Sequence, residues 1–247
     1  MIPKAIHYVW FGGGEFNQLE EHCIASWRKH MPEYKIVRWD ENNFDTNTCD
    51  YIREAIHAKK WAFASDYARF KILYENGGVY LDTDVELLKS IDSIVEAGPF
   101  MGFETDPGSN SGGAVAPGLG LAADPGLEIY RAILDSYECD HFIRSGGIYD
   151  QSTVVVRVTD ILKERGLKDV PGMQEVAGIT IYPSEFFCPK DFLTGNLNIT
   201  NNTCSIHHYD GTWAGPFTRI KHRIMRRIGP RGVARYKTLK SKLRDGA

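Results

Sequence analysis

ASDYARFKILYENGGVYLDTDVE, residues 64–86, is the stretch that decides the fold. Its first half predicts a helix, because apolar residues recur three and four positions apart. The pair Gly77-Gly78 predicts where that helix ends, since glycine readily adopts the positive φ with which many helices stop. The β-branched and apolar run over 79–81 then predicts a short strand. The helix therefore leads into the strand through a defined turn.

Two aspartates follow this strand, separated by one residue. Because side chains alternate along a strand, we expect Asp82 and Asp84 on the same side, with Thr83 opposite. Neighbouring carboxylates repel each other, and a divalent cation that also binds a diphosphate would neutralise them. The alternative is a solvated turn, since an isolated Asp-x-Asp is a common tripeptide.

A charged pair precedes the glycines. Asp66 and Arg69 are three positions apart on the predicted helix, so they share a face and an intrahelical ion pair is expected. Taken together, Ser-Asp-x-x-Arg, Gly-Gly and Asp-x-Asp resemble the central motif of the DXD sugar transferases, glycosyltransferase family 32. That family includes bacterial capsular-polysaccharide transferases and fungal α-mannosyltransferases, and the glucosyltransferase domain of the large clostridial toxins is a more distant relative. With matches near both ends of the chain, the resemblance covers most of residues 2–213.

Length and composition indicate a soluble globular protein. The chain has 247 residues, enough for one large domain, with 43% hydrophobic and 25% charged residues. No apolar run approaches 18 residues, and the N-terminus lacks the features of a signal peptide, so no segment is expected to be removed there. Five scattered cysteines without a Cys-x-x-Cys pair favour neither disulfides nor zinc. We therefore expect a cytoplasmic protein.

The C-terminal segment carries a different charge from the rest. Residues 219–247 contain eleven Lys or Arg and one acidic residue, whereas residues 1–218 contain 18 basic and 31 acidic residues. We expect a catalytic domain over 1–218 and a basic helical tail over 219–247. Within this tail, residues 219–244 could rest on the anionic inner face of a membrane, or the tail could fold back on the acidic domain. Nucleic acid is not expected as a partner, because no recognition motif accompanies the charge.

Strands and helices alternate along the first domain. Strands are predicted at 2–11, 34–39, 100–104 and 179–182, and helices at 20–28, 50–68 with a break near Lys59-Lys60, 125–137 and 153–165. A Gly-, Ser- and Pro-rich stretch at 106–120 predicts a loop. This order favours an α/β fold, and the resemblance implies the nucleotide-sugar-binding GT-A type, with a mostly parallel central sheet flanked by helices.

The first predicted strand ends at a tryptophan followed by three glycines. This segment resembles the N-terminal Ile-Pro-Lys-x-Ile-His-x-x-Trp signature of the family. The resemblance implies that Trp10 stacks on the base of the nucleotide. The alternative is a core aromatic residue at the end of a strand.

Two further segments resemble functional parts of such enzymes. Asp150-Gln151 is placed in the sequence as a polar pair that lies near the anomeric carbon in related retaining transferases, although Asp150 could simply cap the following helix. Ile-His-His-x-x-x-x-Trp, ending at Trp213, resembles the C-terminal motif. It implies that His208 completes the metal shell and that Trp213 contacts the donor, while the choice between His207 and His208 stays open.

The resemblance implies a metal-dependent, retaining glycosyltransferase that uses Mn²⁺ or Mg²⁺ and a nucleotide diphosphate sugar, with a UDP-sugar expected ahead of a GDP-sugar. Asp82, Asp84 and His208 would bind the metal, and Asp66 and Arg69 would hold the donor sugar. The residues with implied catalytic roles are Asp66, Arg69, Asp82, Asp84, Asp150 and Gln151.

The expected acceptor of the transferred sugar is a saccharide or a lipid-linked glycan in capsule or surface-polysaccharide synthesis. Three other functions stay open: hydrolysis of a nucleotide sugar, toxin-like glycosylation of a protein, and carbohydrate binding without catalysis.

Overall fold

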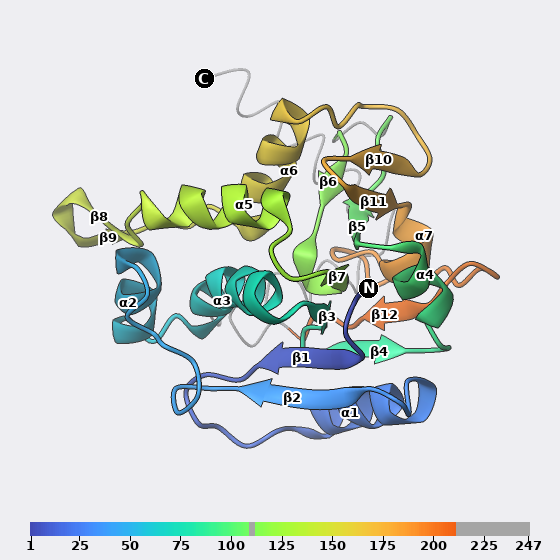
Figure 1. Ribbon diagram of the computed structural model, residues 1–247, viewed down its shortest axis with the longest axis horizontal. Helices are drawn as coiled ribbons and strands as arrows, with labels where there is room; N and C mark the ends of the chain where they lie inside the picture. Colours follow the sequence, from blue (N-terminus) through green and yellow to red (C-terminus); the bar gives the residue numbers. More distant parts are fainter. Residues whose placement is uncertain (109–111, 211–247) are drawn as a thin grey trace.

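A computed structural model describes residues 1–108 and 112–210, and Figure 1 shows how the elements are arranged. The helices are α1 (Gln18–His30), α2 (Asp50–His57), α3 (Trp61–Asn76), α4 (Asp92–Ala97), α5 (Glu128–Glu138), α6 (Val154–Glu164) and α7 (Ser184–Phe187), with 3-10 turns η1 (Pro117–Leu119) and η2 (Ser145–Gly147). The predictions for Trp213, for the domain boundary at residue 218 and for the tail 219–247 lie outside the described residues.

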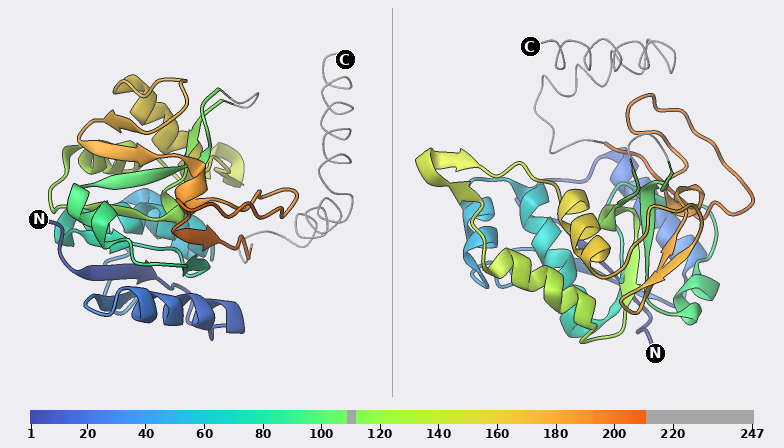
Figure 2. Two further views of the ribbon diagram at one scale, coloured as in Figure 1. Left: turned by 90° about the vertical axis from the view of Figure 1, so that its right-hand side faces the viewer. Right: turned by 90° about the horizontal axis from the view of Figure 1, so that it is seen from above.

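Most of the strands are short. They are β1 (Ala5–Val9), β2 (Lys35–Trp39), β3 (Gly78–Tyr80), β4 (Val85–Leu87), β5 (Phe100–Thr105), β6 (Ala114–Val115), β7 (Leu121–Ala123), β8 (Ile143–Arg144), β9 (Ile148–Tyr149), β10 (Gln174–Val176), β11 (Ile179–Tyr182) and β12 (Ser205–His207). β4 and β12 form a small separate sheet, and β8 and β9 form a hairpin that projects from one end of the molecule (Figures 1 and 2).

The central sheet has eight strands in the order β10-β11-β5-β7-β3-β1-β2, with β6 paired to β5 beside this path. β1 is parallel to both β2 and β3, and β11 is parallel to β5. β7 is antiparallel to both β3 and β5, so these two strands point the same way. β2, β1, β3, β5 and β11 therefore share one direction. The predicted α/β class with a mostly parallel central sheet is confirmed.

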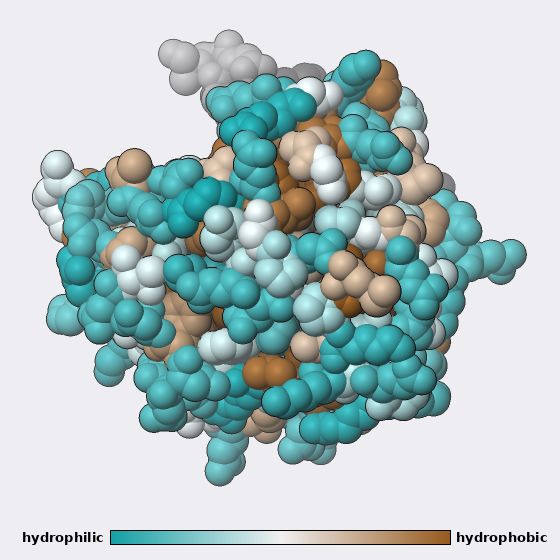
Figure 3. Space-filling model, viewed as in Figure 1, coloured by the Kyte–Doolittle hydropathy of each residue, from teal (hydrophilic) through white to brown (hydrophobic). Residues whose placement is uncertain are grey.

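Helices cover both faces of the sheet and bury two hydrophobic clusters. Side chains of α2, α3, α5 and α6 form one cluster, and side chains of α1 and α4 belong to the other. Neighbouring strand residues enter opposite clusters, as Tyr8 and Val9 do, because side chains alternate across a sheet. Hydrophilic residues cover most of the face in Figure 3, where apolar residues show only in small patches. Among the described residues, no helix is both long and apolar enough to cross a bilayer.

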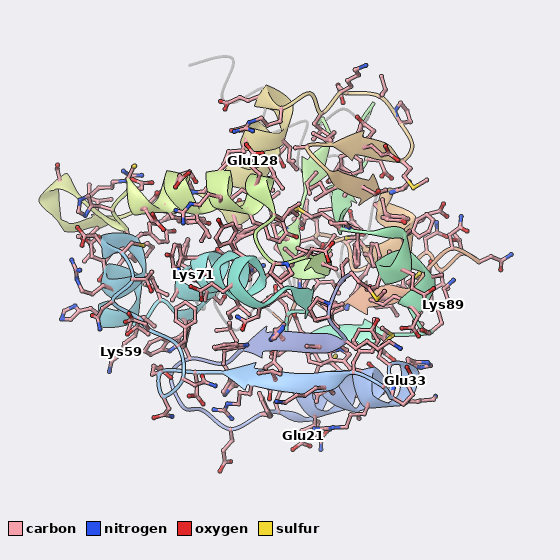
Figure 4. All side chains as sticks on the ribbon, viewed as in Figure 1. Glu21, Glu33, Lys59, Lys71, Lys89 and Glu128 are labelled. Atoms are coloured by element: carbon pink, nitrogen blue, oxygen red, sulfur yellow. The ribbon has the colours of Figure 1, made fainter. Side chains whose placement is uncertain are left out.

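The helix predicted over 50–68, with a break near Lys59-Lys60, forms parts of two helices in the structure. α2 ends at His57 and α3 begins at Trp61. Lys59, labelled in Figure 4, lies between them with φ of 55° and is exposed. A non-glycine residue with positive φ interrupts a right-handed helix, so the break predicted near Lys59-Lys60 is confirmed.

The glycine pair after α3 is required for steric reasons as well as conformational ones. Gly77 and Gly78 have φ of 64° and 97°. A Cβ on Gly77 would lie 2.7 Å from a Pro125 carbon, and a Cβ on Gly78 would lie 2.8 Å from the Ala5 carbonyl oxygen. Glycine at both positions lets the chain leave α3 and enter β3 directly beside β1.

The two aspartates of the Asp-x-Asp do not continue the strand. β3 ends at Tyr80, and the amide of Val85 donates to the Asp82 carbonyl over 3.0 Å, which makes residues 82–85 a β-turn. The expected alternation of Asp82, Thr83 and Asp84 along a strand is therefore wrong. The predicted loop 106–120 also contains β6 and η1, and η1 packs against this turn.

Candidate active site

The candidate site lies at the carboxyl ends of parallel strands. β1 and β3 run in parallel, so the residues that follow them, Trp10 and Asp82, lie at the same edge of the sheet. In open α/β sheets this edge is where ligands bind. Trp10 donates from Nε1 to the Gly14 carbonyl over 2.7 Å, and its ring centroid is 4.5 Å from that of Phe16. Its indole therefore folds over the glycine loop that follows β1.

Arg69 connects the helix to the strand end. Its Nη2 lies 2.8 Å from Asp66 Oδ1 and 3.3 Å from Asp82 Oδ1. Its guanidinium also lies 5.1 Å from the centre of the Tyr80 ring. Arg69 is buried, whereas Asp66 and Asp82 keep 14% and 25% of their side-chain surface exposed. The predicted Asp66–Arg69 pair is confirmed, and the same arginine also holds the first aspartate of the Asp-x-Asp.

Burial raises the pKa of both carboxyl groups. Desolvation raises the pKa of Asp66 to about 7, although Arg69 acts in the opposite direction. Desolvation also raises the pKa of Asp82, which Arg69 again opposes and the nearby Asp84 reinforces. Negative charge is therefore costly on this side of the site, and a cation or a hydrogen-bond donor from a ligand would stabilise it.

A glycine of η1 gives Asp82 its position. A Cβ on Gly118 would lie 2.3 Å from Asp82 Oδ2 and 3.3 Å from Arg69 Nη1. Any larger side chain would displace the carboxylate, because Arg69 already fixes its other oxygen. Sequence reasoning missed this residue, since a glycine in a Gly- and Pro-rich segment indicates only a loop.

The second aspartate has different partners, which the C-terminal part of the chain supplies. β12 is antiparallel to β4 and places His207 opposite Val85. His207 Nε2 lies 3.0 Å from Asp84 Oδ1, and the backbone amide of Asp210 donates to Asp84 Oδ2 over 3.0 Å. Two segments more than a hundred residues apart in sequence thus meet at one carboxylate.

The electrostatic state of Asp84 differs from that of Asp82. Burial works to raise its pKa, but His207 and the Asp210 amide outweigh burial and lower it to about 2. His207 in turn has a raised pKa: burial opposes the charge, while Asp84 favours it. Asp84 is therefore an anion at neutral pH. His207 Nδ1 is buried and has no hydrogen-bond partner among the described residues.

His208, which the sequence implies as the metal ligand, faces a different carboxylate. Its Nε2 lies 2.8 Å from Glu86 Oε2, and His22 Nε2 lies 2.9 Å from Glu86 Oε1. Between the two histidines left open by the sequence, it is His207 whose ring contacts the Asp-x-Asp. Glu86 and His22 were missed, because neither stands in a motif that the sequence singles out.

Asp150 and Gln151 lie apart from this cluster. Asp150 Oδ2 lies 2.7 Å from Arg144 Nη2, and Asp150 Oδ1 accepts from the Ser152 amide over 2.8 Å. Gln151 is exposed just after the β8–β9 hairpin. Among the described residues, no contact joins either side chain to Asp66, Asp82 or Asp84.

The donor chemistry of the site fits a divalent metal that shares its ligands with a substrate. Within residues 1–108 and 112–210, no three His, Cys, Asp or Glu side chains are grouped so that they could hold a metal by themselves. Asp82 and Asp84 offer two carboxylates, and His207 has a buried nitrogen without a partner. Mg²⁺ and similar hard cations commonly bind one or two carboxylates together with substrate phosphates and water. The residues present fit that kind of shared site.

The sequence of the site matches a known family. Residues 17–101 match the family described as "Glycosyltransferase sugar-binding region containing DXD motif". The matched segment includes Asp66, Arg69, Asp82 and Asp84, which meet in the structure. This match confirms the resemblance to the DXD sugar transferases.

Curated relatives match over part of the chain. An uncharacterised glycosyltransferase of Acanthamoeba polyphaga mimivirus is 31% identical over 114 residues, which are 40% of this chain and 42% of the relative. Inositol phosphoceramide mannosyltransferase 3 of Schizosaccharomyces pombe is 29% identical over 101 residues, which are 38% of this chain and 27% of the relative. The chain thus matches less than half of the length of these relatives.

A solved structure described as the PaToxG glycosyltransferase is similar with a TM-score of 0.48 and 16% identity. The similarity covers 66% of this chain and 69% of the PaToxG chain.

Proposed function

We propose that the protein transfers a sugar from a nucleotide diphosphate sugar to an acceptor with the help of a divalent metal. The match of residues 17–101 to the glycosyltransferase sugar-binding family with a DXD motif supports this proposal. The observation that carries the proposal is the contact of Arg69 with both Asp66 and Asp82 beside the anionic Asp84. These groups offer hydrogen bonds for a sugar and ligands for a metal at the ligand-binding edge of the sheet.

The proposed roles follow from the partners of each side chain. When bound, Mn²⁺ or Mg²⁺ would neutralise the charge that develops on the leaving diphosphate. Asp82, Asp84 and either His207 or His208 would hold it, and the contact with Asp84 favours His207. Asp66 and Arg69 would bind hydroxyl groups of the donor sugar, as the family resemblance implies.

The base of the nucleotide is proposed to stack on Trp10, next to the glycine loop. Trp213, outside the described residues, is proposed to contact the donor from the other end of the chain. A UDP-sugar stays the first candidate donor. Because one of the relatives reported above is named a mannosyltransferase, GDP-mannose belongs in the same test.

We propose that the reaction retains the anomeric configuration. Asp150 is paired with Arg144, and Gln151 is exposed, so neither side chain lies at the aspartate cluster. A role near the anomeric carbon therefore requires that a bound substrate reach the β8–β9 hairpin. Proton NMR of the first product formed would give the configuration at the anomeric carbon. A product with inverted configuration would reject retention and would leave the proposed donor-binding residues unaffected.

The proposed acceptor is a glycan or a lipid-linked saccharide, in capsule or surface-polysaccharide synthesis. The name of the relative inositol phosphoceramide mannosyltransferase 3 favours an acceptor with a lipid part. A cytoplasmic location at the inner face of a membrane is part of this proposal, and the basic segment 219–247 supports it through its charge. Toxin-like glycosylation of a protein is the alternative acceptor class.

A screen of nucleotide sugars tests the function. Purified protein is incubated with UDP- and GDP-sugars and saccharide acceptors, with and without Mn²⁺, and the products are separated into transferred sugar and free sugar. We expect metal-dependent turnover of one donor, which Asp84→Ala abolishes while the protein stays folded. Asp160→Ala, which removes an exposed carboxylate of α6, serves as the control and should keep full turnover. Turnover by a folded Asp84→Ala protein would reject the metal assignment, and free sugar in the presence of every acceptor would indicate a hydrolase.

A further inference from the structure

Asp84 is held from three directions by one short segment. We define the clamp as residues His207–Asp210. The His207 ring contacts Asp84 Oδ1 over 3.0 Å, the Asp210 amide donates to Oδ2 over 3.0 Å, and the His208 amide donates to the Asp84 carbonyl over 2.9 Å. The position of the clamp therefore determines the orientation of the Asp84 carboxylate and backbone carbonyl.

Glu86 holds the clamp at His208. Its two carboxylate oxygens accept from different imidazoles, His22 Nε2 at 2.9 Å and His208 Nε2 at 2.8 Å. Glu86 is on β4, two residues after Asp84, and His22 is on α1. A carboxylate with both oxygens engaged has little freedom to rotate, and hydrogen bonds to a charged acceptor are the stronger kind. Glu86 therefore ties the clamp to α1 and to the strand that follows the Asp-x-Asp.

The next clamp residue, Tyr209, has a backbone conformation that needs support from its surroundings. Its φ is 55°, in the left-handed region that bulky residues avoid. Its hydroxyl donates to Glu104 Oε1 over 3.0 Å and lies 3.0 Å from the sulfur of the buried Cys188. Strained residues of this kind persist only where the surroundings hold them, and they concentrate at functional sites.

The Tyr209 ring also packs against the His207 imidazole. The centroids of the Tyr209 and His207 rings are 4.1 Å apart. His207 thus contacts both this ring and Asp84, so Tyr209 helps to hold the imidazole at the carboxylate. Glu104 belongs to β5, in the central sheet, which makes the support rigid.

We infer that Glu86 and Tyr209 are positioning residues, which lock the clamp onto Asp84 so that this carboxylate and His207 are oriented before a donor arrives. The inference rests on the proposed function, because it assigns the locked carboxylate to donor binding. Neither residue contacts Asp84 with its own side chain in the structure; each acts through a clamp residue, His208 or His207. Pre-orientation of this kind strengthens binding by reducing the order that a ligand must impose.

Hydrogen exchange of the ligand-free protein tests the lock without reference to activity. Glu86→Ala removes both acceptors, and Tyr209→Phe removes only the hydroxyl. Each change deletes at least one hydrogen bond to a charged group, about 1.5 kcal/mol, which corresponds to roughly tenfold faster exchange. We expect this acceleration in a peptide covering 205–210 and not in peptides from α5. Unchanged exchange of that peptide in both variants would overturn the inference.

Two matched controls separate the lock from a general loss of stability. Glu54→Ala removes a carboxylate that also accepts from an imidazole, His141 Nδ1 at 2.8 Å, and that has the same exposure of 20% as Glu86. Tyr130→Phe removes a buried hydroxyl, which donates to the Ala122 carbonyl over 3.3 Å. Neither control should accelerate exchange at 205–210. Equal acceleration in a control would show that the effect is not local and would count against the lock.

Binding then shows whether the lock serves the donor site. Calorimetry with UDP or GDP in the presence of Mn²⁺ should give about tenfold weaker binding to Glu86→Ala and Tyr209→Phe, with the controls unchanged. For an active donor, KM should rise by a larger factor than kcat falls. Faster hydrogen exchange at 205–210 with unchanged nucleotide binding would show that the two residues do not prepare the site for the donor, and it would overturn the inference. Faster exchange in a protein that binds no nucleotide at all would instead leave the lock standing and reject the proposed function.

Discussion

Arg69 joins the middle of α3 to the end of β3, since its Nη2 lies 3.3 Å from Asp82 Oδ1 while also contacting Asp66 at 2.8 Å. The guanidinium carries several N–H donors, so Arg69 can contact both carboxylates at once. The arginine is therefore both a structural link and part of the candidate site, and its replacement should affect stability and activity together.

Arg69→Met should lower the free energy of unfolding by about 3 kcal/mol, because it leaves buried carboxylates without their cation. Denaturant unfolding at neutral pH measures this change. The chain offers a matched control: Asp50 and Arg53 have the same spacing, yet their side chains are 45% and 52% exposed. Arg53→Met should cost less than about 0.5 kcal/mol. Similar costs for the two substitutions would contradict the buried linkage.

Gly118→Ala should reduce donor turnover far more than it reduces stability. The added Cβ would meet Asp82 Oδ2 at 2.3 Å, and the carboxylate can rotate away more easily than the backbone of η1 can move. We expect Mn²⁺-dependent turnover to fall about a hundredfold, equivalent to about 3 kcal/mol, with less than about 1 kcal/mol lost from unfolding. Parallel measurements of turnover and of the unfolding midpoint check this. Wild-type turnover in Gly118→Ala would show that the observed position of Asp82 is not needed.

His7 should make the fold sensitive to acid. It is 4% exposed on β1, and desolvation lowers its pKa to about 4 from the ordinary 6.5. Its Nδ1 accepts from the Trp39 indole over 3.0 Å. A proton on Nδ1 would turn this nitrogen into a donor that faces the indole N–H, so the hydrogen bond would be lost. Below pH 6.5 the unfolded chain binds this proton and the folded chain does not, so stability falls as the pH drops.

The loss from this group should amount to about 3 kcal/mol between pH 6.5 and 4. His7→Gln keeps an acceptor for Trp39 and does not titrate in this range. Its unfolding free energy should therefore decline less steeply than that of the wild type over the same pH interval, as urea titrations at several pH values would show. Identical slopes would mean that His7 is not the group responsible.

The parts of the site that the sequence predicts are those that local chemistry determines. The Asp66–Arg69 pair follows from a spacing of three on a helix. The end of α3 follows from Gly77 and Gly78, whose positive φ the structure shows. The order of strands and helices follows from apolar runs of sufficient length. Each of these predictions uses residues close together in the chain.

The parts that the sequence does not predict depend on contacts between distant segments. Nothing near Gly118 indicates that Asp82 packs against it. β4 and β12 have three residues each, too few for a periodic pattern, and their pairing brings His207 rather than His208 to Asp84. A one-residue change in strand register exchanges the two histidines, so sequence spacing alone could not choose between them.

Substitution of each histidine distinguishes their roles. His207→Ala should remove most Mn²⁺-dependent turnover, because it deletes the side chain that contacts Asp84 and the buried nitrogen that lacks a partner. His208→Ala should cost less, since its ring contacts Glu86. Titration of Mn²⁺ at a fixed donor concentration compares the apparent metal affinities. A larger loss of Mn²⁺ affinity in His208→Ala would instead support His208 as the metal ligand, as the family resemblance implies.

The basic segment 219–247 should recruit the protein to anionic membranes. It carries eleven Lys or Arg and a single acidic residue. Each such residue near an anionic surface contributes on the order of 1 kcal/mol, so even half of them would hold the protein there at low salt. Sedimentation with vesicles containing phosphatidylserine, and with neutral vesicles, measures this. A chain truncated after Gly215 should lose the salt-sensitive binding and keep its donor chemistry. If full-length protein ignores the anionic vesicles at low salt, the segment has another role, such as folding back on residues 1–218, whose 31 acidic residues exceed the 18 basic ones.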